Sequence, residues 1–328
     1  MLLSRFFIAL WRLFVDALGV FVTLLKVMVP ALLVVKVLEM VGATQWVGVA
    51  LGPLMELLGL PPELGIVWAA TLLTNIFTGL VVFFEVTGDA SLSVTQVTVL
   101  GALLLIGHSL PVEGAVAKRA GVPWWATIVL RVGGALVFAA LVNWSYRLLG
   151  ARWLGYGQQA AELAWRPEPP ADGVGHWLVG QLSTLGLIFV IIFALMALLE
   201  VLRFFNLERL VHLALSPLLR LLGIGRGAAN VTVIGVTLGL SYGAGLLIRD
   251  LNAGVMSRRD AILALCFLGL CHSVIEDTLL ILLLGAELWA VLGVRIVFSI
   301  VVIALIARWP QQQRPASRRR PEVNNPPL

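Results

Sequence analysis

The chain has 328 residues, of which 60% are hydrophobic and 12% are charged, and its formal net charge is +5. Soluble domains are typically about 45–50% apolar and about 25% charged, so this composition excludes a water-soluble protein and predicts a multi-pass integral membrane protein. Much of the positive excess lies in the C-terminal stretch QQQRPASRRRPEVNNPPL, so we interpret it as a topology signal and expect no nucleic-acid partner.

Apolar windows of about 20 residues recur along the chain, which predicts an all-α, polytopic helical bundle. In the first half we expect a span after an amphipathic N-terminal stretch, a short amphipathic segment, a Gly/Thr-rich apolar segment, a helix with a central His-Ser pair and a closing span (17–39, 46–60, 64–85, 93–120 and 124–148). The same order recurs in the second half (178–202, 207–222, 228–249, 257–284 and 288–309).

The two halves overlay when the sequence is shifted by 164 residues. LGPLMELLGL (51–60) then meets LSPLLRLLGI (215–224), with six of ten positions identical. The shift also places the first His-Ser pair on the second, Glu113 on Asp277 and Arg131 on Arg295. We therefore expect two homologous repeats with a polar linker between them and a disordered basic tail after them (repeats 1–150 and 177–310, linker 151–176, tail 311–328).

The charges near the spans indicate that the repeats are inverted. Residues 39–63 contain three Glu and no Lys or Arg, whereas the matching region 203–227 contains four Arg and one Glu. Because Lys and Arg favour the cytoplasmic side, this reversal predicts halves that sit upside down relative to each other, with both termini cytoplasmic. Each half then needs an odd number of crossings, so the Gly/Thr-rich segments are expected to enter and leave on one side. The alternative is that they cross straight, which gives parallel repeats.

Each His-Ser helix carries ionisable groups near the centre of an apolar stretch, where such groups are costly and functional by default. Residues i and i+4 share a helix face, so each helix is expected to present an imidazole, a hydroxyl and a carboxylate toward one cavity. The alternative is a His–carboxylate pair that only locks helix packing. The residues of this predicted substrate site are His108, Ser109 and Glu113 in the first half and His272, Ser273, Glu276 and Asp277 in the second.

A proline distinguishes the two helices. We expect Pro111 to break the first helix just after its His-Ser pair, because proline cannot continue the hydrogen-bond ladder of a helix. The second helix has Ile275 at the corresponding position and is expected to be straighter.

Further polar residues complete the predicted site. Arg131 and Arg295 lie two turns into the closing spans, where each is expected either to pair with a carboxylate or to snorkel to the interface. Asn75 and Ser241 fall just before apparent breaks in the Gly/Thr-rich segments and are the preferred ligand-facing pair, and Tyr242 is placed to stack on a ring. Helix packing alone is the alternative for these small and hydroxyl residues.

The paired Gly-His-Ser (107–109) and Cys-His-Ser (271–273) segments, together with the duplicated halves, resemble the Gate, or nucleoside-recognition, domain family. That family is similar to the membrane parts of ferrous-iron permeases and to spore-maturation membrane proteins. The resemblance covers nearly the whole chain, with one Gate unit per half, and it implies a nucleoside as the solute. The chain has no G-x-x-x-x-G-K-[ST] motif, so it does not resemble a complete iron permease.

Three functions remain open. The first is a transporter for a small polar solute or ion, with a proton or sodium as the coupling ion and no bound cofactor. The second is a divalent-metal permease with Cys271, His272, Glu276 and Asp277 as ligands. The third is a non-transporting membrane assembly partner. We expect no enzyme, because a His and a Ser adjacent on a helix do not face each other as a nucleophile and its base must, and because the sequence has no H-E-x-x-H motif. The expected location is the cell inner membrane, in contact with lipid, and a homo-oligomer remains open.

Overall fold

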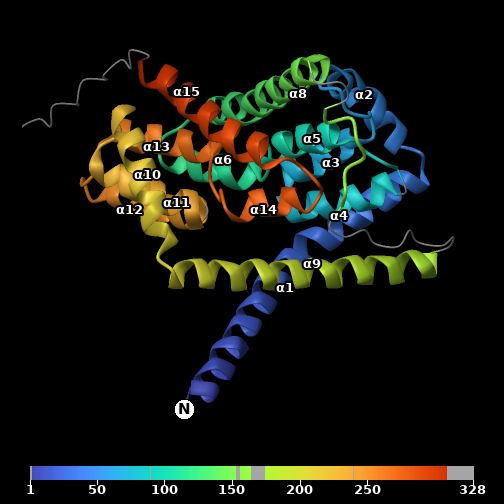
Figure 1. Ribbon diagram of the computed structural model, residues 1–328, viewed down its shortest axis with the longest axis horizontal. Coiled ribbons are helices and arrows are strands. Elements are labelled where there is room, and N and C mark those ends of the chain that lie inside the picture. Colours follow the sequence, from blue (N-terminus) through green and yellow to red (C-terminus); the bar gives the residue numbers. More distant parts are fainter. Residues whose placement is uncertain (1, 89, 153–155, 164–173, 239, 309–328) are drawn as a thin grey trace, which may run out of the picture.

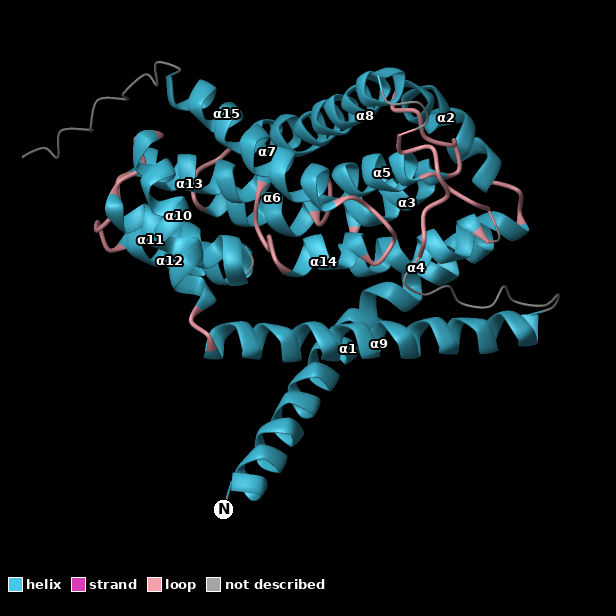
Figure 2. Cartoon of the chain, viewed as in Figure 1, coloured by secondary structure: helices cyan, strands magenta, loops and turns pink. Residues whose placement is uncertain are grey.

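The computed structural model describes residues 2–88, 90–152, 156–163, 174–238 and 240–308. This part of the chain consists of helices and connecting loops (Figures 1 and 2). The first half contains α1 (Leu2–Met40), α2 (Thr44–Leu57), α3 (Leu64–Leu73), α4 (Ile76–Thr87), α5 (Val94–Ile106), α6 (Leu110–Arg119), α7 (Trp124–Ile128), the π-helical turn η1 (Val129–Gly133) and α8 (Gly134–Arg152). The second half contains α9 (Val174–Phe204), α10 (Leu207–Leu221), α11 (Arg226–Leu238), α12 (Leu240–Asn252), α13 (Arg258–Leu270), α14 (Glu276–Leu282), the π-helical turn η2 (Trp289–Val294) and α15 (Arg295–Arg308).

Among the described residues, five helical stretches are long and apolar enough to cross a membrane. The fold is therefore an all-α, multi-pass membrane bundle, as predicted. The stretches are Phe7–Met40, Val94–Arg119, Trp124–Gly150, Gly175–Phe204 and Trp289–Arg308. The expected basic tail, 311–328, lies outside the described residues.

The long helices α1 and α9 pack against each other on one side of the bundle (Figure 1). Phe189 of α9 contacts Phe14 and Phe21 of α1, with ring centroids 5.6 and 5.4 Å apart. The N-terminal part of α1 extends away from the remaining helices, and its apolar side chains are mostly exposed. This is the surface composition that a lipid environment favours.

The Gly/Thr-rich segments fold as helical hairpins. The first helix of the hairpin, α3, ends at Leu73, and Asn75 adopts an extended conformation that caps α4, with its side chain accepting a hydrogen bond from the amide of Thr78 (2.9 Å). Helices of 10 and 12 residues are about 15 and 18 Å long, too short to cross a hydrocarbon core of about 30 Å. The hairpin therefore has the geometry that the re-entrant prediction requires.

Glycine residues, which have no side chain, allow the two arms of each hairpin to approach closely. Gly79 of α4 packs directly on the Thr71 side chain of α3. In the second half a Cβ atom on Gly243 of α12 would lie 2.7 Å from the Cα atom of Gly235 of α11. Glycine is required at these contacts because any side chain would force the arms apart.

Both His-Ser helices are broken, which corrects two expectations. Helix α5 ends at Ile106 and α6 begins at Leu110, so the break contains the His-Ser pair and precedes Pro111. Pro111 lies in the first turn of α6, where its missing amide hydrogen costs little, and it is not the cause of the break. The second helix breaks at the same place, between α13 and α14, and is not straighter.

The two breaks share an unusual backbone. Ser109 and Ser273 have φ angles of 51° and 45°, in the left-handed region that non-glycine residues seldom occupy. Their neighbourhoods are tied to the hairpins, because the amide of Ser109 donates to the Thr71 carbonyl (3.1 Å) and the amide of Val274 donates to the Val236 carbonyl (2.9 Å). Each hairpin thus supports the break in its own half.

The offset of 164 residues recurs in the helices. Helices α5 and α13 begin and end 164 residues apart, and each starts after a capping serine, Ser93 and Ser257. Both helices are deeply buried, so the breaks that follow them lie inside the bundle. The repeat boundaries themselves stay a prediction.

Candidate functional site

The two breaks bring His108 and His272 together. Their Nε2 atoms are 2.9 Å apart, and the two side chains are 5% and 4% exposed. Each Nδ1 atom contacts the carbonyl of the residue four positions earlier, Leu104 (2.9 Å) and Leu268 (2.8 Å). A carbonyl can only accept, so both Nδ1 atoms carry the hydrogen and a neutral ring presents a bare lone pair at Nε2. Two lone pairs at this separation need a proton or another cation between them.

Two carboxylates, one from each half, lie beside the histidines. Glu113 of α6 places Oε1 3.6 Å from Nε2 of His108 and 3.4 Å from Nε2 of His272. Asp277 of α14 approaches the histidine of the other half, with Oδ2 3.8 Å from Nε2 of His108. This Oδ2 atom is buried and has no hydrogen-bond donor among the described residues. The cluster therefore consists of groups that accept hydrogen bonds or bind cations.

Two buried arginines hold the breaks in place. Arg131 donates to the carbonyl of His108 in its own half and to that of Gly269 in the other, both at 2.6 Å. Arg131 also forms an ion pair with Oε2 of Glu113. These donors satisfy carbonyls that the interrupted helices leave without partners.

Arg295 mirrors this arrangement. It donates to the carbonyls of Leu270 (3.0 Å) and His272 (3.1 Å) in its own half and to that of Leu105 (3.1 Å) in the other. Arg131 and Arg295 are 1% and 0% exposed, so neither snorkels to an interface. Both lie at π-helical turns, a geometry that is frequent at functional sites.

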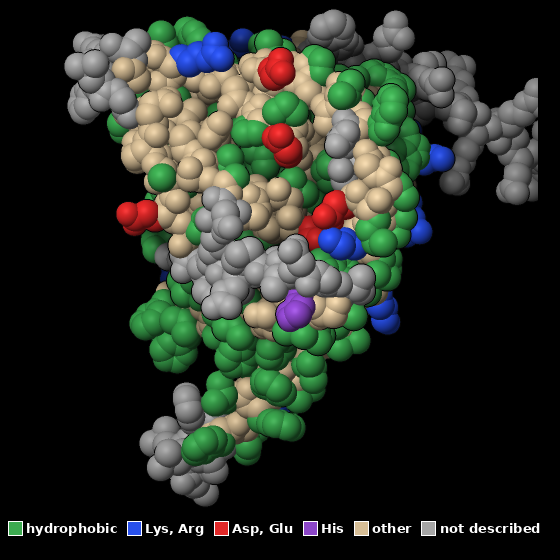
Figure 3. Space-filling model, turned by 90° about the vertical axis from the view of Figure 1, so that its right-hand side faces the viewer, with side chains coloured by type: hydrophobic (Ala, Val, Ile, Leu, Met, Phe, Trp, Pro, Cys, Tyr) green, Lys and Arg blue, Asp and Glu red, His purple; other side chains and the backbone are tan. Residues whose placement is uncertain are grey.

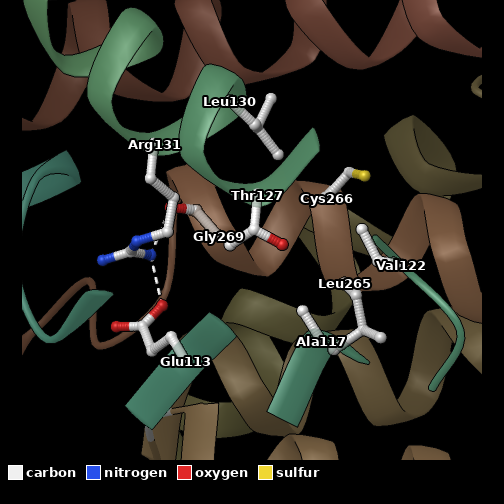
Figure 4. A pocket seen from close by; sticks show the side chains of 9 residues that line it. All are labelled: Glu113, Ala117, Val122, Thr127, Leu130, Arg131, Leu265, Cys266 and Gly269. Atoms are coloured by element: carbon white, nitrogen blue, oxygen red, sulfur yellow. Dashed lines mark hydrogen bonds and ion pairs between the residues drawn. The ribbon is translucent and has the colours of Figure 1, made fainter. Parts of the chain in front are cut away.

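A small cavity of about 20 Å³ adjoins the ion pair of Glu113 and Arg131 (Figure 4). It has room for about one water molecule. Thr127 lines the cavity, and its buried hydroxyl has no hydrogen-bond partner among the described residues. An apolar groove of about 590 Å³ shares Val122, Leu130 and Cys266 with the cavity and reaches the exposed Trp125. The Glu113 side of the cluster therefore lies close to the surface of the bundle.

The other predicted site residues have different surroundings or roles. The Asn75 side chain is used by the cap of α4, and Cys271 is buried at the C-terminal end of α13. The side chains of Ser241 and Tyr242 lie outside the described residues. Ser109 and Ser273 serve as the left-handed backbone positions of the breaks, and Glu276 is half-buried beside Asp277.

The sequence did not indicate how Glu287 is held. Its Oε2 atom accepts hydrogen bonds from the hydroxyls of Tyr146 (2.6 Å) and Tyr156 (2.8 Å) and from the indole of Trp289 (2.6 Å). These contacts tie the described part of the linker, 156–163, to the second half. Glu287 belongs to no recognisable motif, and its donors Tyr146 and Tyr156 are far away in the sequence, so only the neighbouring Trp289 could have suggested a contact.

Four acidic residues of the first half line one cavity. Glu39, Glu56, Glu63 and Glu85 line a space of about 660 Å³ between α1, α2 and the α3–α4 hairpin. Figure 3 shows the face at this end of the molecule, where acidic side chains stand among apolar ones. From the sequence, the negative charge of this region indicated only how the halves are oriented in the membrane. It did not indicate that these four residues share a cavity.

Comparison with known proteins shows one relationship of useful length. No protein-family model and no solved structure matches the chain, so the resemblance to the Gate family stays a prediction. The chain is 30% identical over 299 residues to a protein of Bacillus subtilis (strain 168) named "Uncharacterized membrane protein YvoD". The match covers 90% of this chain and 93% of that protein. The chain therefore belongs to the family of membrane proteins that includes YvoD.

Proposed function

We propose that the protein is a transporter that moves a small polar solute or ion through the site where its two halves meet. One observation carries this proposal: His108, His272, Glu113 and Asp277 converge inside the bundle, and each half supplies two of them. Ionisable groups inside a membrane protein are costly and mark ion or substrate pathways by default.

The broken helices support the same function. Irregular backbone is tolerated at membrane depth only where protein or a cavity surrounds it, and interrupted helices at a repeat interface are a transporter design. Here both interruptions meet at the histidines, and each arginine contacts the interruptions of both halves. A site made from two halves can open to either side when the halves move.

The loop contacts favour the inverted arrangement of the halves, for a protein that we place in the inner membrane. Segments expected outside the cell contact one another, because the linker donates from Ala161 to the Leu92 carbonyl (2.8 Å) and from Tyr156 to Glu287 (2.8 Å). Segments expected on the cytoplasmic side also contact one another, because Arg259 donates to the carbonyls of Gly223 (3.4 Å) and Ala307 (3.1 Å). In this arrangement the acidic cavity opens outside and both termini are cytoplasmic.

The Gate resemblance adds nucleosides to the solutes to be tested. A thermal-shift screen of the detergent-purified protein tests the proposal with nucleosides, sodium at several pH values, and ferrous, manganese and zinc ions. A ligand that binds only the native state raises stability by mass action, by about 2.7 kcal/mol at 100 times its Kd. We expect one ligand class to raise the melting temperature.

The variants make the screen specific to the site. His108→Ala/His272→Ala is expected to abolish the shift, whereas the matched control His176→Ala/His212→Ala, which removes two histidines elsewhere, is expected to keep it. A complete absence of shifts with folded wild-type protein, or a shift that survives in the site variant, contradicts the proposal.

A further inference from the structure

We propose that the site binds one divalent transition-metal ion, with Nε2 of His108, Nε2 of His272 and Oε1 of Glu113 as ligands and the carboxylate of Asp277 as a fourth group beside them. That this ion is the transported solute rests on the proposed function. Its starting point is that the three ligand atoms lie within 4.8 Å of one another and come from both halves.

The orientation of the imidazoles is the first argument. A histidine that binds a metal through one nitrogen almost always donates the hydrogen of the other to a carbonyl, carboxylate or water. His108 and His272 both do so, through Nδ1 to the carbonyls of Leu104 and Leu268. The two rings are therefore held in the tautomer that binds a metal through Nε2, and both Nε2 atoms point to the same place.

The carboxylates are prepared in a similar way. Arg131 engages Oε2 of Glu113 and leaves Oε1 facing the two histidines. Asp277 presents a buried Oδ2 atom that has no donor in the described part of the chain. A shared proton between the histidines would satisfy their two nitrogens but would supply no partner for Oδ2 of Asp277.

The distances fit a metal of the first transition row. With metal–ligand bonds of about 2.1 Å, neighbouring ligands lie about 3.0 Å apart in an octahedral site and about 3.4 Å apart in a tetrahedral site. The two Nε2 atoms are 2.9 Å apart, and Glu113 Oε1 is 3.4 and 3.6 Å from them. Small shifts of the side chains are therefore enough to close the site around an ion.

The donor set selects the class of ion. Imidazole with carboxylate suits zinc, ferrous iron, manganese or cobalt, whereas calcium, magnesium and sodium prefer sets made of oxygen alone. Copper(I) prefers thiolate ligands, and none of the atoms that converge here is a thiolate. The proposed ligands come from both halves. They replace the set predicted from the sequence, in which Cys271, His272, Glu276 and Asp277 of one half bind the ion.

Cobalt(II) is the probe for the decisive experiment, because its visible spectrum reports on its ligands. The full-length protein in detergent is stripped with a chelator, titrated with cobalt(II), and then analysed for bound metal; zinc and manganese are tested by competition. We expect one ion per chain, visible bands without a thiolate charge-transfer band in the near ultraviolet, and displacement by zinc.

The variants test each ligand separately. His108→Gln, His272→Gln and Glu113→Gln are each expected to weaken binding at least about 10-fold, since even the loss of an outer-shell partner typically costs 10–100-fold. Cys271→Ser and the double variant His176→Gln/His212→Gln are expected to bind as the wild type does. Because the wild-type stoichiometry and spectrum need no variant, a misfolded variant leaves the test intact.

Three results overturn the inference: wild-type protein that binds no metal, binding that survives in folded His108→Gln/His272→Gln, or a thiolate band that disappears in Cys271→Ser. Reconstituted liposomes separate this inference from the proposed function. Metal binding at the site without any flux supports the inference and refutes transport, whereas flux of a solute by protein that binds no metal refutes the inference and supports transport.

Discussion

At the residue scale, Arg131 and Arg295 donate hydrogen bonds to backbone carbonyls at the helix breaks, which water would satisfy in a soluble protein. Each fills the place of helix amides that the breaks remove, and each joins the two halves through backbone carbonyls. Arg131 in addition balances the charge of Glu113. A buried ion pair is itself weak evidence for stability, but the loss of one partner leaves an uncompensated charge and is costly.

We therefore predict that Arg131→Met lowers the stability of the detergent-purified protein by about 3–5 kcal/mol. The surface variant Arg147→Met serves as the control and is expected to change stability little, because Arg147 is exposed. Adding Glu113→Gln to Arg131→Met should recover part of the loss, since the unpaired carboxylate is then neutral. Melting curves that coincide for Arg131→Met and wild type would contradict this account of the ion pair.

The residues of the cluster could be predicted from the sequence because ionisable groups stand out in apolar stretches. The 164-residue offset within the sequence also pairs His108 with His272 and Glu113 with Asp277. The cross-half contacts could not be predicted, because helix periodicity places Asp277 near its own half's pair and says nothing of the other half. Cys271 was included for its chemistry alone, and it lies at the C-terminal end of α13, where the first half has Gly107.

At the scale of elements, the hairpins depend on close contact between short helices. The contact of Gly243 with Gly235 joins α12 to α11, and in the first half Gly79 and Thr71 make the corresponding contact. The hairpins in turn hold the breaks, through the Thr71 and Val236 carbonyls. Packing of the hairpin arms is therefore coupled to the position of the histidines.

We predict that Gly243→Ala destabilises the protein by about 1–3 kcal/mol, because the added methyl group overpacks the contact. Gly245→Ala is a matched control on the same helix, where nothing lies within 4 Å of the new Cβ atom. This control should be neutral or slightly stabilising, since alanine favours helix over glycine by about 0.5–1 kcal/mol. Thermal unfolding of both variants checks the prediction, and equal effects at the two positions would refute it.

The order of elements was predictable, but their interruptions were not. Hydropathy located the spans, and Asn75 was predicted to stand just before a break, whereas it lies within the break, as the N-cap of α4. Proline suggested the wrong cause for the break near Pro111. The break arises from the left-handed Ser109 and from Arg131, which lies 23 residues after the carbonyl of His108 that it binds, and no local propensity encodes such a distant donor.

At the scale of the whole molecule, the proposed inversion of the halves would place equivalent residues on opposite sides of the membrane. Glu56 of α2 and Arg220 of α10 occupy equivalent positions in the two halves, and both are exposed. We predict that, in a Cys266→Ala/Cys271→Ala background, Glu56→Cys reacts with an impermeant maleimide in intact cells, whereas Arg220→Cys reacts only after the membrane is opened. Labelling of both positions from the same side would instead show parallel repeats.

We propose that a solute passes through the site shared by His108 and His272. Uptake into liposomes that contain the purified protein tests it most directly, with zinc, manganese and nucleosides as labelled solutes. The account predicts uptake by the wild type and by His176→Ala/His212→Ala, and none by folded His108→Ala/His272→Ala. Uptake that persists without both site histidines, or wild-type liposomes that take up none of these solutes under any gradient of protons or sodium, would contradict it.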